Sequence, residues 1–131
     1  AGGLSVIGDL YKTQVYALAK HINRDKVIIP ENILIKAPSA ELRPEQKDSD
    51  SLPEYPILDA VLYQYIECRS SHKDIVSRGY DPATVSRILR LVNNAEYKRH
   101  QFCPILRISP KAFGSGRRMP VVGRYPDSDE V

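Results

Sequence analysis

The sequence predicts a mainly helical domain that is interrupted by one long loop. Apolar residues recur at helical spacing near residues 9–22, 56–65, 71–78 and 81–95, and this spacing is typical of amphipathic helices. Residues 36–54 have neither helical nor strand periodicity, and they mix three prolines with charges of both signs. The length of 131 residues allows one modest domain.

The first helix is expected to begin at Asp9, because a carboxylate suits an N-cap. Lys12 then falls in the first turn, where its charge opposes the helix macrodipole. A lysine beside unpaired backbone N–H groups forms an anion site, although a solvated surface lysine fits the same position. The β-branched runs at residues 27–30 and 33–35 are too brief to distinguish a strand from buried coil.

Each of the three later helices has a local start or stop signal. Pro56 suits a first helical position, and the short helix over residues 71–78 is expected to end at Gly79. Asp81 followed by Pro82 marks the start of the longest helix. The predicted core faces are Leu58, Val61, Leu62 and Tyr65, then Val85, Ile88, Leu89, Val92 and Ala95.

The end of the longest helix changes from apolar to charged. At about 100° per residue, Glu96 and Arg99 continue the apolar stripe of that helix. Hydrophobic burial is therefore expected to end there, with Lys98 on the flank of the same helix.

Charge is unevenly distributed along the chain, although the formal net charge is only +3. Residues 1–66 carry seven basic against nine acidic side chains, whereas residues 67–131 carry twelve against seven. Residues 97–124 hold seven basic side chains and no acidic one. Such a segment attracts phosphates, and a solvated basic tail is the plainer interpretation.

The two cysteines, Cys68 and Cys103, lie far apart and form no metal-ligand pattern. They indicate two reduced thiols in a cytoplasmic protein. Because no apolar run reaches the length of a membrane span and no signal peptide is visible, we expect no membrane contact.

Several separate motifs resemble the C-terminal half of NAD synthetase. They are GGLSVIGD (2–9), KT (12–13), KAPSAELRP (36–44), QKD (46–48) and EYKR (96–99). Two tail motifs are similar to the glutamine-dependent branch of that family, namely SPKAFG (109–114) and GRRMP (116–120). The matches run in order from residue 2 to about residue 125, which is nearly the whole chain.

This resemblance implies an α/β fold, a Rossmann-like ATP-pyrophosphatase domain of the adenine nucleotide alpha hydrolase type. The chain is expected to be a mainly helical C-terminal fragment of it, formed by residues 1–125, with a disordered acidic tail at 126–131. The loop at 36–54 is expected to be mobile and to close over a charged ligand. The family's Ser-Gly-Gly-x-Asp-Ser phosphate loop and its magnesium-binding acid are absent, so they are expected upstream of Ala1.

The implied activity is that of a ligase that converts deamido-NAD to NAD with ATP and ammonia, through an adenylated intermediate. Lys12 and Ser39 match the family's ATP contacts, and Lys98, with Tyr97 before it, matches a deamido-NAD contact. No residue is assigned a covalent catalytic role, and the Mg²⁺ ligands are expected outside this chain. The implied partners are an upstream glutamine amidase domain and further copies in a homo-oligomer, without nucleic acid.

Two departures favour the glutamine-dependent branch. The ammonia-only branch more often has His at the position of Tyr97, and it has an acidic dinucleotide contact that would align near Gly3. The dinucleotide assignment therefore rests on Lys98, with Tyr97 beside it.

Part of the sequence also fits a different class of function. Residues 71–92 also fit a helix-turn-helix nucleic-acid-binding module, with basic residues in the tail adding phosphate contacts. Its outward residues would be Thr84, Ser86, Arg87 and Arg90. Helix pairs joined by short turns are common in proteins that do not bind DNA, so this alternative is the weaker one. The third possible function is that of a small helical interaction module without catalysis.

Overall fold

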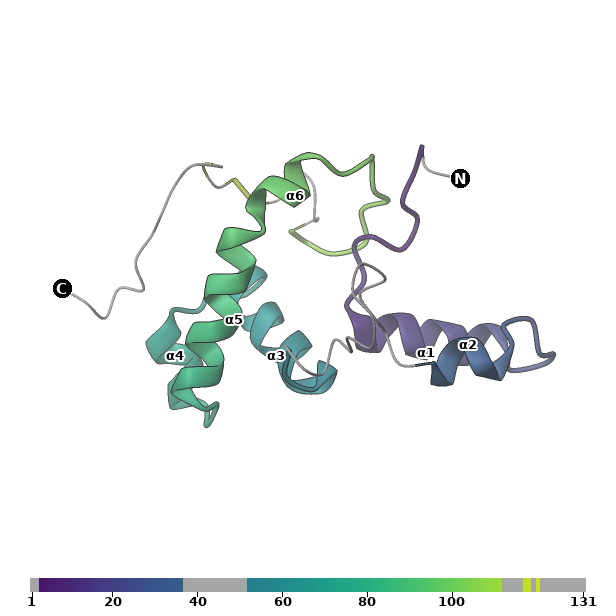
Figure 1. Ribbon diagram of the computed structural model, residues 1–131, viewed down its shortest axis with the longest axis horizontal. Helices are drawn as coiled ribbons and strands as arrows, with labels where there is room; N and C mark the ends of the chain where they lie inside the picture. The colour runs from purple at the N-terminus through teal and green to yellow at the C-terminus, as the bar shows by residue number, and fades with distance from the viewer. Residues whose placement is uncertain (1–2, 37–51, 112–116, 119, 121–131) are drawn as a thin grey trace, which may run out of the picture. The chain divides into compact units, whose positions relative to one another are not determined.

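The computed structural model describes residues 3–36, 52–111, 117, 118 and 120 (Figure 1). The chain divides into two compact units. We call Tyr11–Asp59 the first unit, and Ala1–Leu10 together with Ala60–Val131 the second unit. The described residues contain six helices: α1 (Lys12–Ile22), α2 (Glu31–Ile35), α3 (Tyr55–Ile66), α4 (His72–Ser77), α5 (Pro82–Asn94) and α6 (Glu96–His100). The division between the units falls within α3.

The core of the second unit comes from α3, α4 and α5. Val61, Ile75, Val85 and Ile88 are fully buried, and Leu89 is nearly so. Helix α4 lies along α5, as Figure 1 shows. Each such side chain contributes roughly 1.5–3 kcal/mol through the area it removes from water. The apolar stripe predicted for the longest helix is therefore confirmed at its centre.

Local signals set the ends of α4 and α5 as the sequence predicts. Asp81 caps α5, because its carboxylate accepts a hydrogen bond of 2.8 Å from the backbone N–H of Thr84, and Pro82 is the first helical residue. Ser71 caps α4 in the same way through Asp74 N–H. After α4, Gly79 has a φ of +95°, a conformation that is costly for residues with a Cβ.

The prediction for the first helix is wrong at its start. Helix α1 begins at Lys12 and not at Asp9. The carboxylate of Asp9 instead accepts hydrogen bonds from the backbone N–H groups of Ile108 at 2.8 Å and Ser109 at 2.6 Å. The carboxylate that was expected to cap the helix is thus bound by backbone groups from a distant part of the chain. Local sequence preferences cannot reveal such a partner.

The two short β-branched runs are neither strands nor buried coil. The second run belongs to α2, and Ile33 is 61% exposed. In the first run, the backbone N–H groups of Ile28 and Ile29 donate to Asn23 Oδ1 at 3.0 and 2.8 Å. Asn23 Nδ2 donates back to the carbonyl of Ile29 at 2.7 Å. The side chain of Asn23 thus binds backbone groups that would otherwise pair with a neighbouring strand.

One parallel β-bridge joins the ends of the second unit, between Ser5 and Ile105. The backbone N–H of Ser5 donates to the carbonyl of Pro104 at 2.9 Å, and that of Leu106 donates to the carbonyl of Ser5 at 3.4 Å. The bridge stands alone, because it belongs to no strand among the described residues. It holds the segment before α1 beside the segment that follows α6.

Candidate functional site

Lys12 lies at the start of α1, between two tyrosine rings of its own unit. Its Nζ is 5.5 Å from the centroid of the Tyr16 ring and 5.8 Å from that of Tyr55. A cation over an aromatic face is stabilised by the ring quadrupole, by about 0.5–1 kcal/mol where water has access. Lys12 is half-buried, and its ammonium group is therefore held by rings of its own chain.

The backbone at the start of α1 is already paired with a carboxylate. Thr13 N–H donates to Asp59 Oδ2 at 2.7 Å, and Asp59 is only 8% exposed. Tyr11 N–H donates to Gln14 Oε1 at 2.9 Å. The expectation of unpaired N–H groups beside Lys12 is therefore wrong at these two positions, because acceptors of the same chain occupy them. The side chain of Lys12 remains as the candidate ATP contact.

Ser39, the second predicted ATP contact, lies outside the described residues. So do residues 37–51 of the predicted loop and the acidic tail at 126–131.

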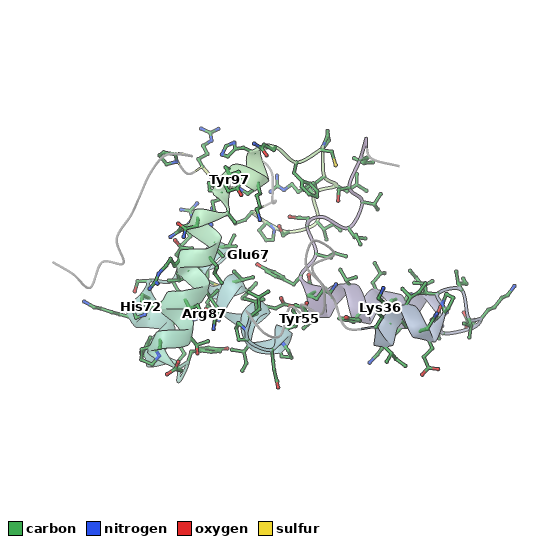
Figure 2. All side chains as sticks on the ribbon, viewed as in Figure 1. Lys36, Tyr55, Glu67, His72, Arg87 and Tyr97 are labelled. Carbon is green, nitrogen blue, oxygen red and sulfur yellow. The ribbon has the colours of Figure 1, made fainter. Side chains whose placement is uncertain are left out.

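Tyr97 and Lys98 lie in α6, which is a separate short helix. The prediction of one continuous helix is wrong here, since α5 ends at Asn94 and Ala95 separates it from α6. Both candidate side chains are exposed, and Tyr97 has 46% of its surface accessible. Figure 2 shows Tyr97 on α6.

The residues on either side of this pair are buried as an ion pair. The side chains of Glu96 and Arg99 are only 4% and 9% exposed. Arg99 Nε donates to Glu96 Oε1 at 3.0 Å, and Arg99 Nη2 contacts the same oxygen. The hydrogen bond from Arg99 lowers the pKa of the Glu96 carboxyl, while burial acts in the opposite direction. The apolar stripe gives way to charged side chains here as expected, but these charges are themselves withdrawn from solvent, which the sequence did not predict.

Arg117 completes this cluster, and the sequence did not predict it. Its guanidinium carbon lies 4.9 Å from the centroid of the Tyr65 ring. Its Nη2 donates to Asn93 Oδ1 at 2.7 Å and to Tyr65 Oη at 3.3 Å. The carbonyl of Arg117 accepts from Arg99 Nη2 at 2.7 Å. We name Tyr65, Asn93, Glu96, Arg99 and Arg117 the clasp.

A signal for the clasp was present in the sequence. Tyr65 places a hydroxyl at the end of a predicted core face, and a polar group that leaves water requires a partner. Within the described part of the chain, every buried side-chain nitrogen and oxygen has one.

Two motifs on which the family resemblance depends meet in the same unit. Asp9 ends the first motif, and Ser109 begins the tail motif. Besides the two backbone bonds to its carboxylate, Asp9 accepts a bond of 3.1 Å from Ser109 Oγ. The structure thus brings together segments that are 100 residues apart.

The helix-turn-helix alternative is not favoured. The α4–turn–α5 pair is present, but Ser86, one of its expected outward residues, is half-buried. Its Oγ lies 2.9 Å from Nε2 of His72, a residue of α4. Ser86 therefore connects the two helices and does not present its hydroxyl to a groove.

Other features of the described residues set limits on the site. Cys68 and Cys103 are free thiols, as expected. None of the described helices is both long and apolar enough to cross a membrane. Nor do three or more His, Cys, Asp or Glu side chains gather anywhere in the described ranges as a metal site would require.

Comparison with known families agrees with the motifs. The NAD synthase family model matches residues 1–102. The chain therefore belongs to the NAD synthase family, which confirms the resemblance.

The similar curated proteins are glutamine-dependent NAD(+) synthetases. The protein of Acinetobacter baylyi is 48% identical over 130 residues, which cover 98% of this chain and 24% of that protein. The protein of Thermotoga maritima is 45% identical, over 97% of this chain and 22% of its own length. The chain thus spans about a quarter of the relatives that it matches.

A solved structure gives the same result for the fold. The glutamine-dependent NAD+ synthetase of Acinetobacter baumannii, in complex with ADP, matches with a TM-score of 0.58 and 37% identity. The match covers 92% of this chain and 21% of that one. The predicted fold class, a mainly helical part of the α/β synthetase domain, is confirmed.

Proposed function

We propose that this chain is the C-terminal part of a glutamine-dependent NAD synthetase. The observation that carries the proposal is the identity of 45–48% to enzymes of that name over nearly the whole chain. In the proposed reaction the carboxylate of deamido-NAD attacks the α-phosphorus of ATP, forming an adenylate and releasing pyrophosphate. Ammonia derived from glutamine then displaces AMP and forms the amide.

Lys12 is proposed to contact ATP. Its charge lies between Tyr16 and Tyr55, so little reorganisation is needed when negative charge develops on a phosphate. Ser39 is proposed as a second, neutral contact, because a hydroxyl donates a hydrogen bond without adding charge.

Lys98 is proposed to contact a phosphate of deamido-NAD, with Tyr97 beside it. Both side chains are exposed while their neighbours Glu96 and Arg99 are buried. The surrounding segment is basic, since residues 97–124 carry seven basic and no acidic side chains. This supports an anionic ligand.

Several parts of the proposed enzyme lie outside the described residues. We place the ligands of Mg²⁺ outside this chain, as the family resemblance implies, and we assign no step to the metal. An amidase domain as the ammonia source, a homo-oligomer and a cytoplasmic location belong to the same proposal, as does the assignment of residues 1–125 to the synthetase domain.

The test is NAD formation by the intact enzyme from deamido-NAD and ATP, with glutamine or ammonia as the nitrogen source. We expect turnover with either source and none from the isolated 131-residue chain, since the chain spans 24% of the A. baylyi enzyme. An intact enzyme that leaves deamido-NAD unchanged with both nitrogen sources would refute the proposal. Turnover by the isolated chain would refute its assignment as a part.

A further inference from the structure

Arg117 connects three helices that are separated in the sequence. Its side chain stacks on Tyr65 of α3 and donates to Asn93 at the end of α5, while its carbonyl accepts from Arg99 of α6. A guanidinium suits this position, because it is planar and offers several donors in a fixed arrangement while it stacks on a ring. A lysine ammonium in its place would keep the charge but would lose the planar shape and the fixed arrangement of donors.

The clasp fixes the rotation of α6 about its own axis. This helix has five residues, and its first and fourth residues are the buried pair Glu96 and Arg99. At about 100° per residue, Lys98 points about 200° away from Glu96 and about 100° from Arg99. The orientation of Lys98 thus follows from the burial of its neighbours. The other residues of α6, Tyr97, Lys98 and His100, are exposed.

Arg117 is one of the residues that attach α6 to its unit. A helix of five residues is not stable alone, and α6 leaves α5 through Ala95 without a continuous helical backbone. The bond of 2.7 Å from Arg99 to the Arg117 carbonyl ties it to a residue that is anchored on α3 and α5.

We infer that Arg117 is a positioning residue for the dinucleotide substrate: through the clasp it holds α6 in the rotation at which Lys98 meets a phosphate of deamido-NAD. The inference rests on the proposed function. We assign Arg117 no contact with the substrate, because its Nη2 donates to Tyr65 and Asn93.

The first experiment compares Arg117→Lys with Arg107→Lys in the intact enzyme. Arg107 is the control, because its guanidinium likewise donates hydrogen bonds within its own chain, to the carbonyls of Ser109 and Pro110, but takes no part in the clasp. For Arg117→Lys we expect KM for deamido-NAD to rise about tenfold, which corresponds to about 1.4 kcal/mol, with KM for ATP unchanged. Arg107→Lys should change neither constant. Equal changes in both KM values would overturn the inference.

A milder variant covers the case in which Arg117→Lys fails to fold. Tyr65→Phe keeps the ring beneath the guanidinium and removes the hydroxyl that accepts from Arg117. It should raise KM for deamido-NAD about threefold and leave KM for ATP unchanged. A folded Tyr65→Phe enzyme with both constants unchanged would overturn the inference.

The second experiment is a double-mutant cycle with Lys98→Ala. If Arg117 acts through Lys98, Arg117→Lys should change KM for deamido-NAD less than twofold once Lys98 is gone, because coupled residues are not additive. An undiminished tenfold effect in that background would mean that Arg117 acts independently of Lys98, and would overturn the inference.

The unaltered enzyme separates this inference from the proposed function. If it forms no NAD, the proposed function fails and the inference with it. If it forms NAD but is insensitive to Arg117→Lys and Tyr65→Phe, only the inference fails.

Discussion

The two candidate lysines are held in different ways. Lys12 is positioned directly, because the rings of Tyr16 and Tyr55 contact its own ammonium group. Lys98 is positioned indirectly, because its neighbours Glu96 and Arg99 are buried while it is exposed. A cation can therefore be prepared for an anionic ligand either by contacts to itself or by fixing the short helix that carries it. The predictions below test this difference.

The largest expected effect is on the buried ion pair that fixes α6. Glu96→Gln leaves Arg99 charged and buried without its carboxylate, which should lower the free energy of unfolding by about 3 kcal/mol. The midpoint of urea unfolding of the intact enzyme measures it. Asp25→Asn is the matched control, because the pair of Arg24 and Asp25 is 67% and 80% exposed, and it should leave the midpoint unchanged. Equal midpoints for both variants would mean that the Glu96–Arg99 pair does not fix α6.

The same pair predicts a pH dependence. Because the native pKa of Glu96 lies below its ordinary value of 4.5, its stabilising contribution is present above about pH 4.5. It is lost as the pH falls through the lowered native pKa. Between pH 7 and pH 3 the difference in unfolding midpoint between the unaltered enzyme and Glu96→Gln should therefore shrink. A difference that is constant over this range would contradict the assignment.

Direct positioning is tested by Lys12→Met, which keeps the aliphatic stem and removes the charge. We expect kcat/KM for ATP to fall by the equivalent of about 2–4 kcal/mol, as for other preorganised groups that stabilise developing charge. Lys20→Met is the control, since Lys20 is an exposed lysine of the same helix. If both variants behave alike, Lys12 is a surface lysine held by two rings and not an ATP contact.

Indirect positioning is tested by Lys98→Ala. The loss of one charged hydrogen bond should weaken the binding of deamido-NAD by about 1.5–3 kcal/mol. The binding of ATP should be weakened much less. The fold should be retained, because Lys98 is exposed. Neutralising Arg107, Lys111 or Arg124 one at a time should matter less. Equal and small losses for all four would indicate a diffuse basic tail.

The smallest effect is expected for Ser39→Ala. It removes one neutral hydrogen bond to ATP, which contributes about 0.5–1.5 kcal/mol. Steady-state kinetics with ATP varied should show a smaller loss than for Lys12→Met. A larger loss would move the main ATP contact from α1 to the loop that contains Ser39.

The helices of the second unit were predictable from sequence because their signals are local. Asp81, Pro82 and Gly79 act within one turn of their own helix ends, and the stripe of Val85, Ile88 and Leu89 follows from helical period. The family assignment was equally accessible, since it needs only motifs in order along the chain.

The partners of the polar side chains were decided only by the tertiary structure. Asp9 was expected to cap a helix and binds Ser109 instead, Asp59 pairs with Thr13, and Arg117 joins Tyr65 and Asn93. A polar group that leaves water must find a partner, and several candidates along a chain satisfy that need equally well. Which of them comes within hydrogen-bond distance depends on how the helices pack, so Lys98 was identifiable from its motif, while the clasp that orients it required the fold.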